Sequence, residues 1–504
     1  MNPGIDGTLW LPRLAALLSG AALPLAFAPF DLWLLAPLAL AVLFWLWSSA
    51  SPREAGKLGY AFGLGLFGVG TSWIFVSMHH FGEAIVPVAG LITLVFAAFM
   101  AIFPALSGWL AARLAAEKST LRLLLAMPLG WMLFELVRGE FLGGFPWLNL
   151  GASQIHSPLA GYVPVLGEYG ASFAVAFSAA LLVLFVTRRA YLAVVGSLFA
   201  LVALWAGGIT LRHIDWVEAT GEPLRVAIVQ GNVEQSRKFD PQVFQATLDL
   251  YRRLTESVPD ARLIVWPETA VPDTVSAASP FLIEMQELMR ARGQDLVLGI
   301  FDQDRLGNYY NAMLALPVEG GYYHKRHLVP FGEYLPLREL ILPFKSLIQV
   351  PMSDLTSGKN DQPLLNLAGQ PVGASICYEA TLARKINTAL PAAAFLINAS
   401  NDAWFGDSLA PHQHLQIAAM RSLESGRWMV RATNTGISAL IDPQGRITAR
   451  TPQFEQAVLQ GEITPMQGAT PFVRFGAWPV WLFSVLGVLA LAGWNYITAE
   501  RSRR

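Results

Sequence analysis

Eight long apolar runs limit most strongly what this chain can fold into. Seven of them lie before residue 215, and the eighth covers residues 475–497. Hydrophobic residues make up 54% of the chain and charged residues only 14%, whereas about 25% of the residues of a soluble domain are charged. Because about 20 apolar residues span a bilayer, these runs predict a polytopic α-helical membrane domain. The early runs are 14–30, 33–47, 58–78, 84–110, 123–137, 159–186 and 190–211.

The basic residues between these runs predict which side of the membrane each loop faces, because cytoplasmic loops carry an excess of Lys and Arg. Arg13 precedes the first two runs and Arg53 follows them, so this stretch is expected to cross twice. Eight spans then place both termini in the cytoplasm. We expect a membrane domain of seven transmembrane helices in residues 1–214 and a periplasmic domain in 215–470. The eighth helix and a basic tail would occupy 471–504.

Two carboxylates fall within or beside the predicted spans. Glu135 lies near the end of the fifth run, and Glu168 lies inside the sixth. Charges in a membrane are costly and often functional, but local pairing is an equal alternative, for example between Glu135 and Arg138 one helical turn on. The formal net charge of −1 gives no general attraction to nucleic acid.

The chain between residues 223 and 470 has a different pattern. Short β-branched runs alternate with helical patterns, which indicates an α/β fold. The run 437–448 is typical of a hairpin and 457–464 of a further strand. The expected strands are 224–232, 262–268, 295–300, 371–379 and 393–401, and the expected helices are 241–257, 280–292 and 412–431.

Three separate motifs in this half carry residues suited to acyl transfer. Glu268 lies in VWPETA (265–270), Lys325 in HKRHLVPFGEY (324–334), and Cys377, the only cysteine, in SICYE (375–379). A cysteine attacks as a thiolate and needs a base, which Glu268 could provide. Lys325 and the backbone N–H of Tyr378 could stabilise the resulting oxyanion. Taken singly, Glu268 could instead cap a turn, and Lys325 could be one solvated charge in a basic cluster.

With these motifs in place, the second half resembles the nitrilase superfamily, and the whole chain resembles the apolipoprotein N-acyltransferase family. The resemblance implies an α-β-β-α sandwich with Glu268 as general base, Lys325 at the oxyanion and Cys377 as nucleophile. Glu333 resembles the family's additional essential glutamate, and Tyr378 and Glu379 resemble the residues flanking the cysteine. Other matching motifs are FPWLNLG (145–151), VQGN (229–232), KRHLVPFGEYLP (325–336), NASNDAWFG (398–406) and RATNTG (431–436).

The resemblance also implies a ping-pong reaction in the bacterial inner membrane. Cys377 would take the sn-1 acyl chain of a phospholipid, typically phosphatidylethanolamine. The thioester would pass it to the α-amine of a diacylglyceryl-cysteine at the N-terminus of an apolipoprotein. We expect no cofactor, no metal and no nucleic-acid partner. Two other classes stay open: a membrane-tethered amidase that hydrolyses, and a transporter or receptor with a binding domain.

Three further residues are candidates for substrate contact. Trp147 belongs to an aromatic and glycine-rich loop after the fifth run, where interfacial anchoring is the simpler explanation. Phe344 belongs to a long apolar arm, 337–352, which directly follows Glu333 and is expected to face lipid as a lid, although burial in the core is the alternative. Asn401 ends a predicted strand, where sites of α/β sheets are usually built.

Overall fold

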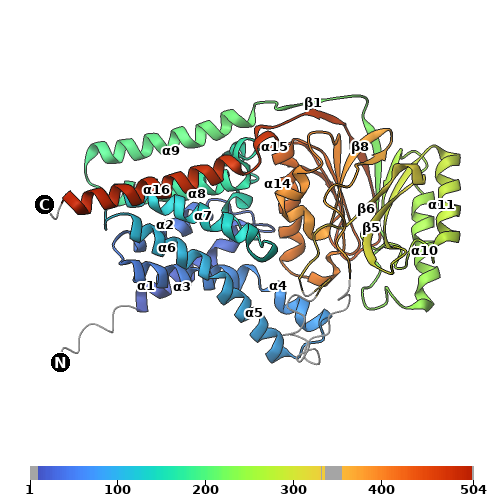
Figure 1. Cartoon of the computed structure of the whole chain (residues 1–504), viewed down its shortest axis with the longest axis horizontal. Helices are drawn as coiled ribbons and strands as arrows, with labels where there is room; N and C mark the ends of the chain where they lie inside the picture. Colours follow the sequence, from blue (N-terminus) through green and yellow to red (C-terminus); the bar gives the residue numbers. More distant parts are fainter. Residues whose placement is uncertain (1–9, 331, 335–354, 502–504) are drawn as a thin grey trace. The chain divides into compact units, whose positions relative to one another are not determined.

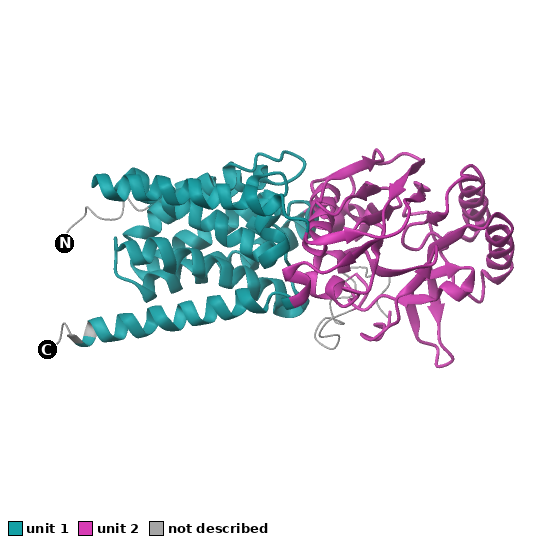
Figure 2. Cartoon of the chain, turned by 90° about the horizontal axis from the view of Figure 1, so that it is seen from above, with its two compact units in different colours: residues 1–75, 87–215, 475–504 teal, residues 76–86, 216–474 magenta. Residues whose placement is uncertain are grey.

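The computed structural model of the chain describes residues 10–330, 332–334 and 355–501. It divides into two compact units, which Figure 2 shows in different colours. Unit 1 comprises Met1–Phe75, Pro87–Asp215 and Phe475–Arg504, and unit 2 comprises Val76–Val86 and Trp216–Arg474. Most of the apolar half of the sequence therefore folds separately from the α/β half. Val76–Val86 of the apolar half belongs to unit 2, and the final helix belongs to unit 1.

Unit 1 consists of helices that correspond to the eight apolar runs. The first two runs form separate helices, because the first helix and the short turn after it end at Ala26 and the next helix begins at Leu35. The helices are α1 (Trp10–Ala22), α2 (Leu35–Ser48), α3 (Pro52–Gly70), α5 (Val86–Met100), α6 (Ile102–Leu114), α7 (Met127–Glu140), α8 (Val163–Thr187), α9 (Tyr191–Arg212) and α16 (Trp478–Arg501), with a short α4 (Trp73–Val76) after α3 (Figure 1).

Four of the described helices are long and apolar enough to cross a membrane by themselves. They cover Val86–Leu114, Pro158–Thr187, Tyr191–Arg212 and Trp478–Thr498. A fifth is reached if Pro52–Gly70 and Trp73–Phe81, which are bent by 49° at their junction, form one span. The apolar helices Trp10–Ala26 and Leu35–Ser48 are shorter. Unit 1 is thus built from membrane helices, and the number of eight spans stays a prediction.

Small residues let α1 and α3 pack closely. A Cβ atom added to Gly20 of α1 would collide with the carbonyl oxygen of Phe62, and one added to Gly65 of α3 would collide with that of Leu17. Close approach of backbones through glycine is a common way to join helices where no hydrophobic effect drives association.

Two buried charges of α7 hold the chain that follows this helix. The Glu135 carboxylate accepts hydrogen bonds from Trp131 Nε1 and from the backbone N–H of Leu150, both at 2.9 Å. The Arg138 guanidinium donates to the carbonyl oxygens of Phe145 and Trp147 and to the Asn149 side chain. Glu135 and Arg138 also attract each other electrostatically. The local pairing considered for Glu135 is therefore present.

Unit 2 contains two six-stranded sheets with related layouts. In the first sheet, β2 (Leu224–Gln230), β3 (Leu263–Val265) and β4 (Asp295–Gln303) are parallel neighbours. In the second, β8 (Gln370–Ile376), β9 (Phe395–Ser400) and β10 (Met429–Thr433) are parallel neighbours. Antiparallel strands flank both triplets: β5 (Tyr309–Leu316), β6 (Tyr322–His324) and β13 (Ala457–Ile463) in the first sheet, and β7 (Leu365–Leu367), β11 (Ala439–Ile441) and β12 (Ile447–Arg450) in the second.

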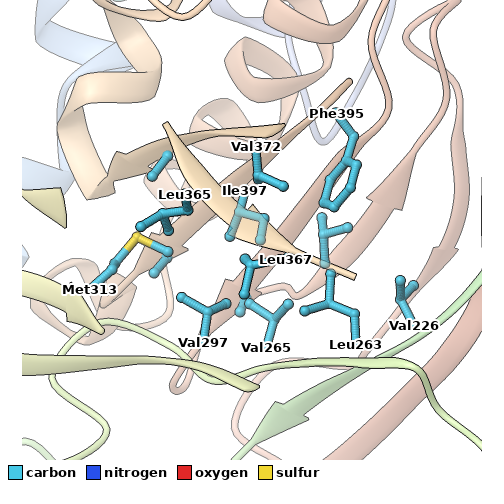
Figure 3. Close-up of a cluster of buried hydrophobic side chains, with 14 of the residues drawn as sticks. Val226, Leu263, Val265, Val297, Met313, Leu365, Leu367, Val372, Phe395 and Ile397 are labelled. Atoms are coloured by element: carbon cyan, nitrogen blue, oxygen red, sulfur yellow. The ribbon is translucent and has the colours of Figure 1, made fainter. Parts of the chain in front are cut away.

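The sheets pack face to face because alternate residues of each strand are apolar. Val226 and Ile228 of β2 face the second sheet, whereas Ala227 and Val229 face the helices on the other side. Figure 3 shows the shared core, in which Phe395 and Ile397 of β9 meet residues such as Leu263 of the first sheet. A period of two along each strand therefore produces both interfaces.

Helices cover the outer faces of this sandwich (Figure 1). Residues of α10 (Pro241–Glu256) and α11 (Ser279–Arg292) pack on the first sheet. The second sheet is covered by α14 (Ala410–Ser425). The layers are α-β-β-α, as the resemblance implied. A separate two-stranded sheet pairs β1 (Val217–Ala219) with β14 (Met466–Gly468).

The helix expected over 412–431 was predicted too long. The helix ends at Ser425, because the next residue, Gly426, is its C-cap and has a left-handed conformation with φ of 64°. Residues Met429–Thr433 then form β10, parallel to β9. The Gly426 signal and the β-branched residues after it were present in the sequence, but the helical pattern was extended across them.

Candidate active site

The three predicted catalytic residues come from the ends of strands in both sheets of unit 2. Glu268 follows β3 and Lys325 follows β6, so both belong to the first sheet. Cys377 follows β8 of the second sheet. The strand ends bring together groups that are more than 50 residues apart in sequence, which is the usual way in which an α/β fold builds a site.

The Lys325 ammonium lies between two carboxylates. Its Nζ atom is 2.7 Å from Glu333 Oε1 and 3.4 Å from Glu268 Oε1, and its side chain is only 1% exposed. Burial by itself lowers the pKa of Lys325, but the charges of Glu333 and Glu268 outweigh it and raise the pKa above its usual value. Lys325 therefore stays a cation at every physiological pH, which its predicted role at the oxyanion requires.

Asn311 of β5 forms hydrogen bonds with both carboxylates, although no sequence motif predicted this residue. Its Nδ2 atom donates to Glu268 Oε1 at 2.7 Å and lies 3.2 Å from Glu333 Oε1. Asn311 lies inside a strand, and the side of the sheet on which its side chain lies depends on the register of β5 with β4. An isolated asparagine in a sequence gives no signal for this role.

The Cys377 backbone is in the left-handed region, with φ of 50°. A non-glycine residue is uncommon there and costs free energy, and such positions cluster at active sites. Burial and the negative charge of Glu268 raise the pKa of the thiol to about 12, although Lys325 opposes this rise. The resting thiol is therefore protonated at neutral pH, and attack requires a base at hand.

A buried polar cluster contacts the backbone carbonyl oxygen of Cys377. His414 Nε2 lies 3.2 Å from the Cys377 carbonyl oxygen, and its Nδ1 lies 3.0 Å from Asp402 Oδ1. Arg431 donates to Asp402 and to Asn398, whose side chain in turn lies 3.4 Å from the Cys377 carbonyl oxygen. His414 lies in α14 and belongs to none of the predicted sites, so the sequence did not predict this support.

Glu379 stabilises the turn that carries the cysteine. The side chain is fully buried and accepts four hydrogen bonds, from Tyr323 Oη and from the N–H groups of Ile376, Arg326 and His327, at 2.8–3.0 Å. Burial raises the pKa of Glu379, and these donors oppose the rise. Glu379 thereby ties the segment after Lys325 to the segment around Cys377.

Lys238 is a second buried ammonium near the base. Its side chain is 3% exposed, and its Nζ atom donates to the backbone carbonyl oxygen of Glu268 at 3.1 Å. Burial lowers the pKa of Lys238 to about 8, although the charge of Glu268 opposes this. Lys238 was not among the predicted residues, because it lies in a loop with other charged residues and gives no motif of its own.

The remaining predicted residues lie in different surroundings. The Tyr378 ring stacks on His327, with ring centroids 5.8 Å apart. Asn401 is buried and donates to Gln235. Trp147 belongs to unit 1, where it is 1% exposed and packs against the rings of Trp73 and Phe145. Their roles in substrate contact stay predictions. Phe344 and the arm 337–352 lie outside the described residues.

Within 10–330, 332–334 and 355–501, there is no group of three or more His, Cys, Asp and Glu residues that could hold a metal ion. Glu268, Lys325 and Cys377 provide a buried carboxylate, a buried cation and a partly buried thiol. This combination fits nucleophilic catalysis of acyl transfer.

Known proteins resemble the chain over nearly its whole length. Residues 225–471 match the carbon-nitrogen hydrolase family, and residues 19–181 match the apolipoprotein N-acyltransferase N-terminal domain. An apolipoprotein N-acyltransferase of Azotobacter vinelandii is 46% identical over 98% of this chain and 96% of the relative. Relatives of the same name from Methylococcus capsulatus and Pseudomonas aeruginosa are each 45% identical over more than nine tenths of both chains.

The chain belongs to the apolipoprotein N-acyltransferase family.

Among solved structures, the C. elegans NitFhit protein matches with a TM-score of 0.38 and 19% identity, covering 53% of this chain and 65% of its own. An amidase of Nesterenkonia from the nitrilase superfamily matches with a TM-score of 0.36 and 16% identity, covering 52% of this chain and 96% of its own. The family assignment rests on the sequence matches. They confirm the nitrilase-like domain, and they show that the same chain also contains the N-terminal domain of the N-acyltransferase family.

Proposed function

We propose that this chain transfers an acyl chain from a phospholipid to the N-terminal diacylglyceryl-cysteine of apolipoproteins through a thioester on Cys377. The observation that supports this proposal is the electrostatic environment of the Cys377 thiol. Cys377 interacts electrostatically with both Glu268 and Lys325, and its neutral state at rest makes a neighbouring base necessary. The names of its close relatives give the reaction class.

In the first half-reaction, Glu268 takes the proton of the Cys377 thiol as the sulfur attacks the ester carbonyl carbon of the donor lipid. The negative charge then develops on the carbonyl oxygen, where Lys325 and the backbone N–H of Tyr378 can stabilise it. When the ester C–O bond breaks, the proton on Glu268 passes to the leaving oxygen. The products are a thioester on Cys377 and a lysophospholipid.

In the second half-reaction, the α-amine of the acceptor attacks the thioester carbonyl carbon. Glu268 takes a proton from the attacking nitrogen and returns it to the leaving sulfur, so that an amide and the free thiol result. Glu333 and Asn311 keep the side chains of Lys325 and Glu268 in position during both half-reactions. No external cofactor enters this scheme.

The proposed setting is the inner membrane of a bacterium, with eight spans and both termini in the cytoplasm. Residues 1–214 and 471–504 would form the membrane-embedded part, and residues 215–470 would work in the periplasm. Both substrates are anchored in the membrane, so this arrangement presents them locally to Cys377. Phosphatidylethanolamine is the proposed donor, and Trp147, Phe344 and Asn401 are proposed as further contacts.

An amidase that hydrolyses its substrate is the alternative with the same three residues. The comparisons favour transfer, because residues 19–181 match the N-terminal domain of the N-acyltransferase family and a relative of that name matches both halves of the chain. The two activities differ in what accepts the acyl group, so they are separable by one experiment.

The test is intact-mass analysis of the purified full-length chain after incubation with phosphatidylethanolamine of defined acyl length. We expect a mass increase equal to one acyl group, located on the peptide that contains Cys377. A synthetic peptide with an N-terminal diacylglyceryl-cysteine should then remove the adduct and gain the same mass. The matched control is an N-acetylated form of that peptide, which has no free α-amine.

Three results would contradict the proposal. One is the absence of an adduct in a protein that is folded. Another is an adduct on any residue other than Cys377. The third is an adduct that water removes as fast as the peptide does, because this outcome identifies a hydrolase.

A further inference from the structure

Unit 1 contains an open cavity that the acyl-transfer chemistry does not use. Its volume is about 450 Å³, and it is lined by the C-terminal part of α2, the start of α3, the loop before α7 and the end of α8. Three of its four charged lining residues are cations, namely Lys118, Arg122 and Arg188. The one lining carboxylate, Glu54, is paired with Arg13 at 2.9 Å and lies 3.6 Å from Lys57.

Arg122 lies at the base of this cavity with an unused donor. The residue is 1% exposed, and its Nη2 atom donates to the carbonyl oxygen of Ala50 at 2.6 Å. Its Nε atom is buried and has no hydrogen-bond partner among the described residues. A buried guanidinium N–H without an acceptor is costly. Glu117 attracts Arg122 electrostatically but does not line the cavity.

The two other cations are exposed at the rim, and hydrogen bonds connect them to neighbouring segments. The N–H of Lys118 donates to the carbonyl oxygen of Ser48 at 2.8 Å, and Arg188 Nη2 donates to the carbonyl oxygen of Lys118 at 2.6 Å. These bonds join the end of α2, the loop before α7 and the end of α8. The three cations therefore line one space.

The uncharged lining includes apolar side chains that suit a lipid, together with serine and threonine hydroxyls. Trp45, Leu58 and Val183 line the same cavity, and Trp45 is 56% exposed, as is usual for a tryptophan at a membrane surface. Basic pockets between membrane helices on the cytoplasmic side are known to bind anionic lipid headgroups. This end of unit 1 is the one that the Lys and Arg pattern predicts to be cytoplasmic.

We propose that this cavity binds the phosphate group of an anionic phospholipid, with Arg122 at its base and Lys118 and Arg188 at its rim. The phosphate oxygens accept hydrogen bonds from Lys118 and Arg188, the buried charge of Arg122 adds electrostatic attraction, and the acyl chains lie along the exposed ring of Trp45. The bound lipid joins α2, α3 and α8 at this end of unit 1. It is a structural ligand and not the acyl donor.

The test uses the full-length chain in phosphatidylcholine nanodiscs, with or without added phosphatidylglycerol, and measures melting temperature and the lipid retained in native mass spectra. Three proteins are compared: the parent, the rim variant Lys118→Gln/Arg188→Gln, and the control Arg113→Gln/Arg189→Gln. The control removes the same two charges from basic residues that do not line the cavity. A parallel arm replaces phosphatidylglycerol with inorganic phosphate.

Phosphatidylglycerol should raise the melting temperature of the parent and the control, and both should retain it. The rim variant should bind it about tenfold or more weakly, because each cation near an anionic headgroup contributes to its binding. The single change Lys118→Gln, at an exposed side chain, should give an intermediate loss if the double variant fails to fold. Equal binding by rim variant and control overturns the proposal, and protection by inorganic phosphate alone overturns its assignment to a lipid.

Discussion

Both units bury acidic and basic side chains together, but they use them differently. In unit 1, the donors of Arg138 and Oε1 of Glu135 bind backbone groups between Phe145 and Leu150. In unit 2, Oε1 of Glu268 and Oε1 of Glu333 bind side-chain donors, and the cation between them interacts with the thiol of Cys377. The first cluster holds a loop in place, whereas the second leaves charge directed at a reactive atom.

The contrast shows that a buried charge does not by itself mark a site. Burial and pairing are similar in the two clusters, and the difference lies in what the charges face. A nucleophile at positive φ beside the charges separates the two cases here. Each of the following changes tests this difference, in order of expected effect.

The strongest test removes the nucleophile. Cys377→Ala should lower acyl transfer to the uncatalysed background, a loss of roughly 10⁴-fold or more, because loss of a nucleophile removes the covalent route. Intact-mass analysis should show no adduct, while the melting temperature stays near that of the parent. Cys377→Ser should fail in the same way. Clear acyl transfer by Cys377→Ala would mean that the charges of unit 2 do not act on this sulfur.

The protonation of Cys377 gives the next largest effect. Because its pKa is about 12 in the fold, at pH 8 the thiol should react with iodoacetamide at least about a hundredfold more slowly than in the denatured chain, as only the thiolate reacts. The rate in the fold should keep rising with pH up to 10. Glu268→Gln should speed this labelling, since the charge of Glu268 raises the pKa, and yet should block acylation. If both rates fall together, Glu268 acts through structure and not as the base.

The same kind of change in unit 1 should affect mainly stability. Arg138→Met leaves Glu135 buried without its neighbouring cation, and loss of one partner of a buried pair costs about 3–5 kcal/mol. We expect a marked fall in melting temperature, and a rate of acylation per folded molecule that falls much less than in Lys325→Ala, since Arg138 holds only the backbone at Trp147 among the proposed contacts. Arg189→Met, at an exposed position, is the control and should change neither. A selective loss of activity in Arg138→Met would remove the distinction between the two clusters.

Lys325→Ala should show the reverse pattern. One oxyanion donor contributes at least about a hundredfold to the rate, so acyl-enzyme formation should slow by that factor in protein that remains folded. Single-turnover mass analysis with phospholipid measures this step separately from transfer to the peptide. An acylation rate equal to that of the parent would assign Lys325 a structural role like that of Arg138.

Lys238 is expected to give the smallest effect. Lys238→Met removes the hydrogen bond to the Glu268 carbonyl oxygen, and a hydrogen bond from a charged group corresponds to about tenfold in rate. Since the pKa of Lys238 is about 8, the parent loses this cation as the pH rises through 8 and should then approach the rate of Lys238→Met. Lys238→Arg stays charged and should lack this pH dependence. A parent profile that is flat around pH 8 would contradict the role.

The sequence predicted the parts of this fold that depend on local pattern. Five strands and the helix α10 were expected close to their observed bounds, because period and β-branching are local signals. Glu268, Lys325 and Cys377 could be found because each stands in its own motif at the end of a strand. The number of spans could not be settled, since α1 and α2 are short and α3 continues into α4 through a bend of 49°.

The supporting residues could not be predicted in the same way. Asn311 reaches Glu268 only because β5 pairs with β4 in one register, and His414 reaches the Cys377 carbonyl oxygen from a helix 37 residues later. Lys238 contacts a backbone oxygen, which no side-chain motif can indicate. Contacts that depend on long-range packing leave no periodic signal in one sequence.

The division of the site between two sheets has a consequence for how the enzyme comes into being. Glu268 and Lys325 are on one sheet and Cys377 is on the other, so the thiol has neither its base nor its cation until the interface in Figure 3 is closed. A nascent or partly opened chain therefore has a thiol without the base and the cation that the proposed acyl transfer requires, and it should not react with the lipids of the membrane into which it is being inserted. Packing of the two sheets is therefore required before acylation can occur, and acylation of this chain indicates that the sheets have packed together.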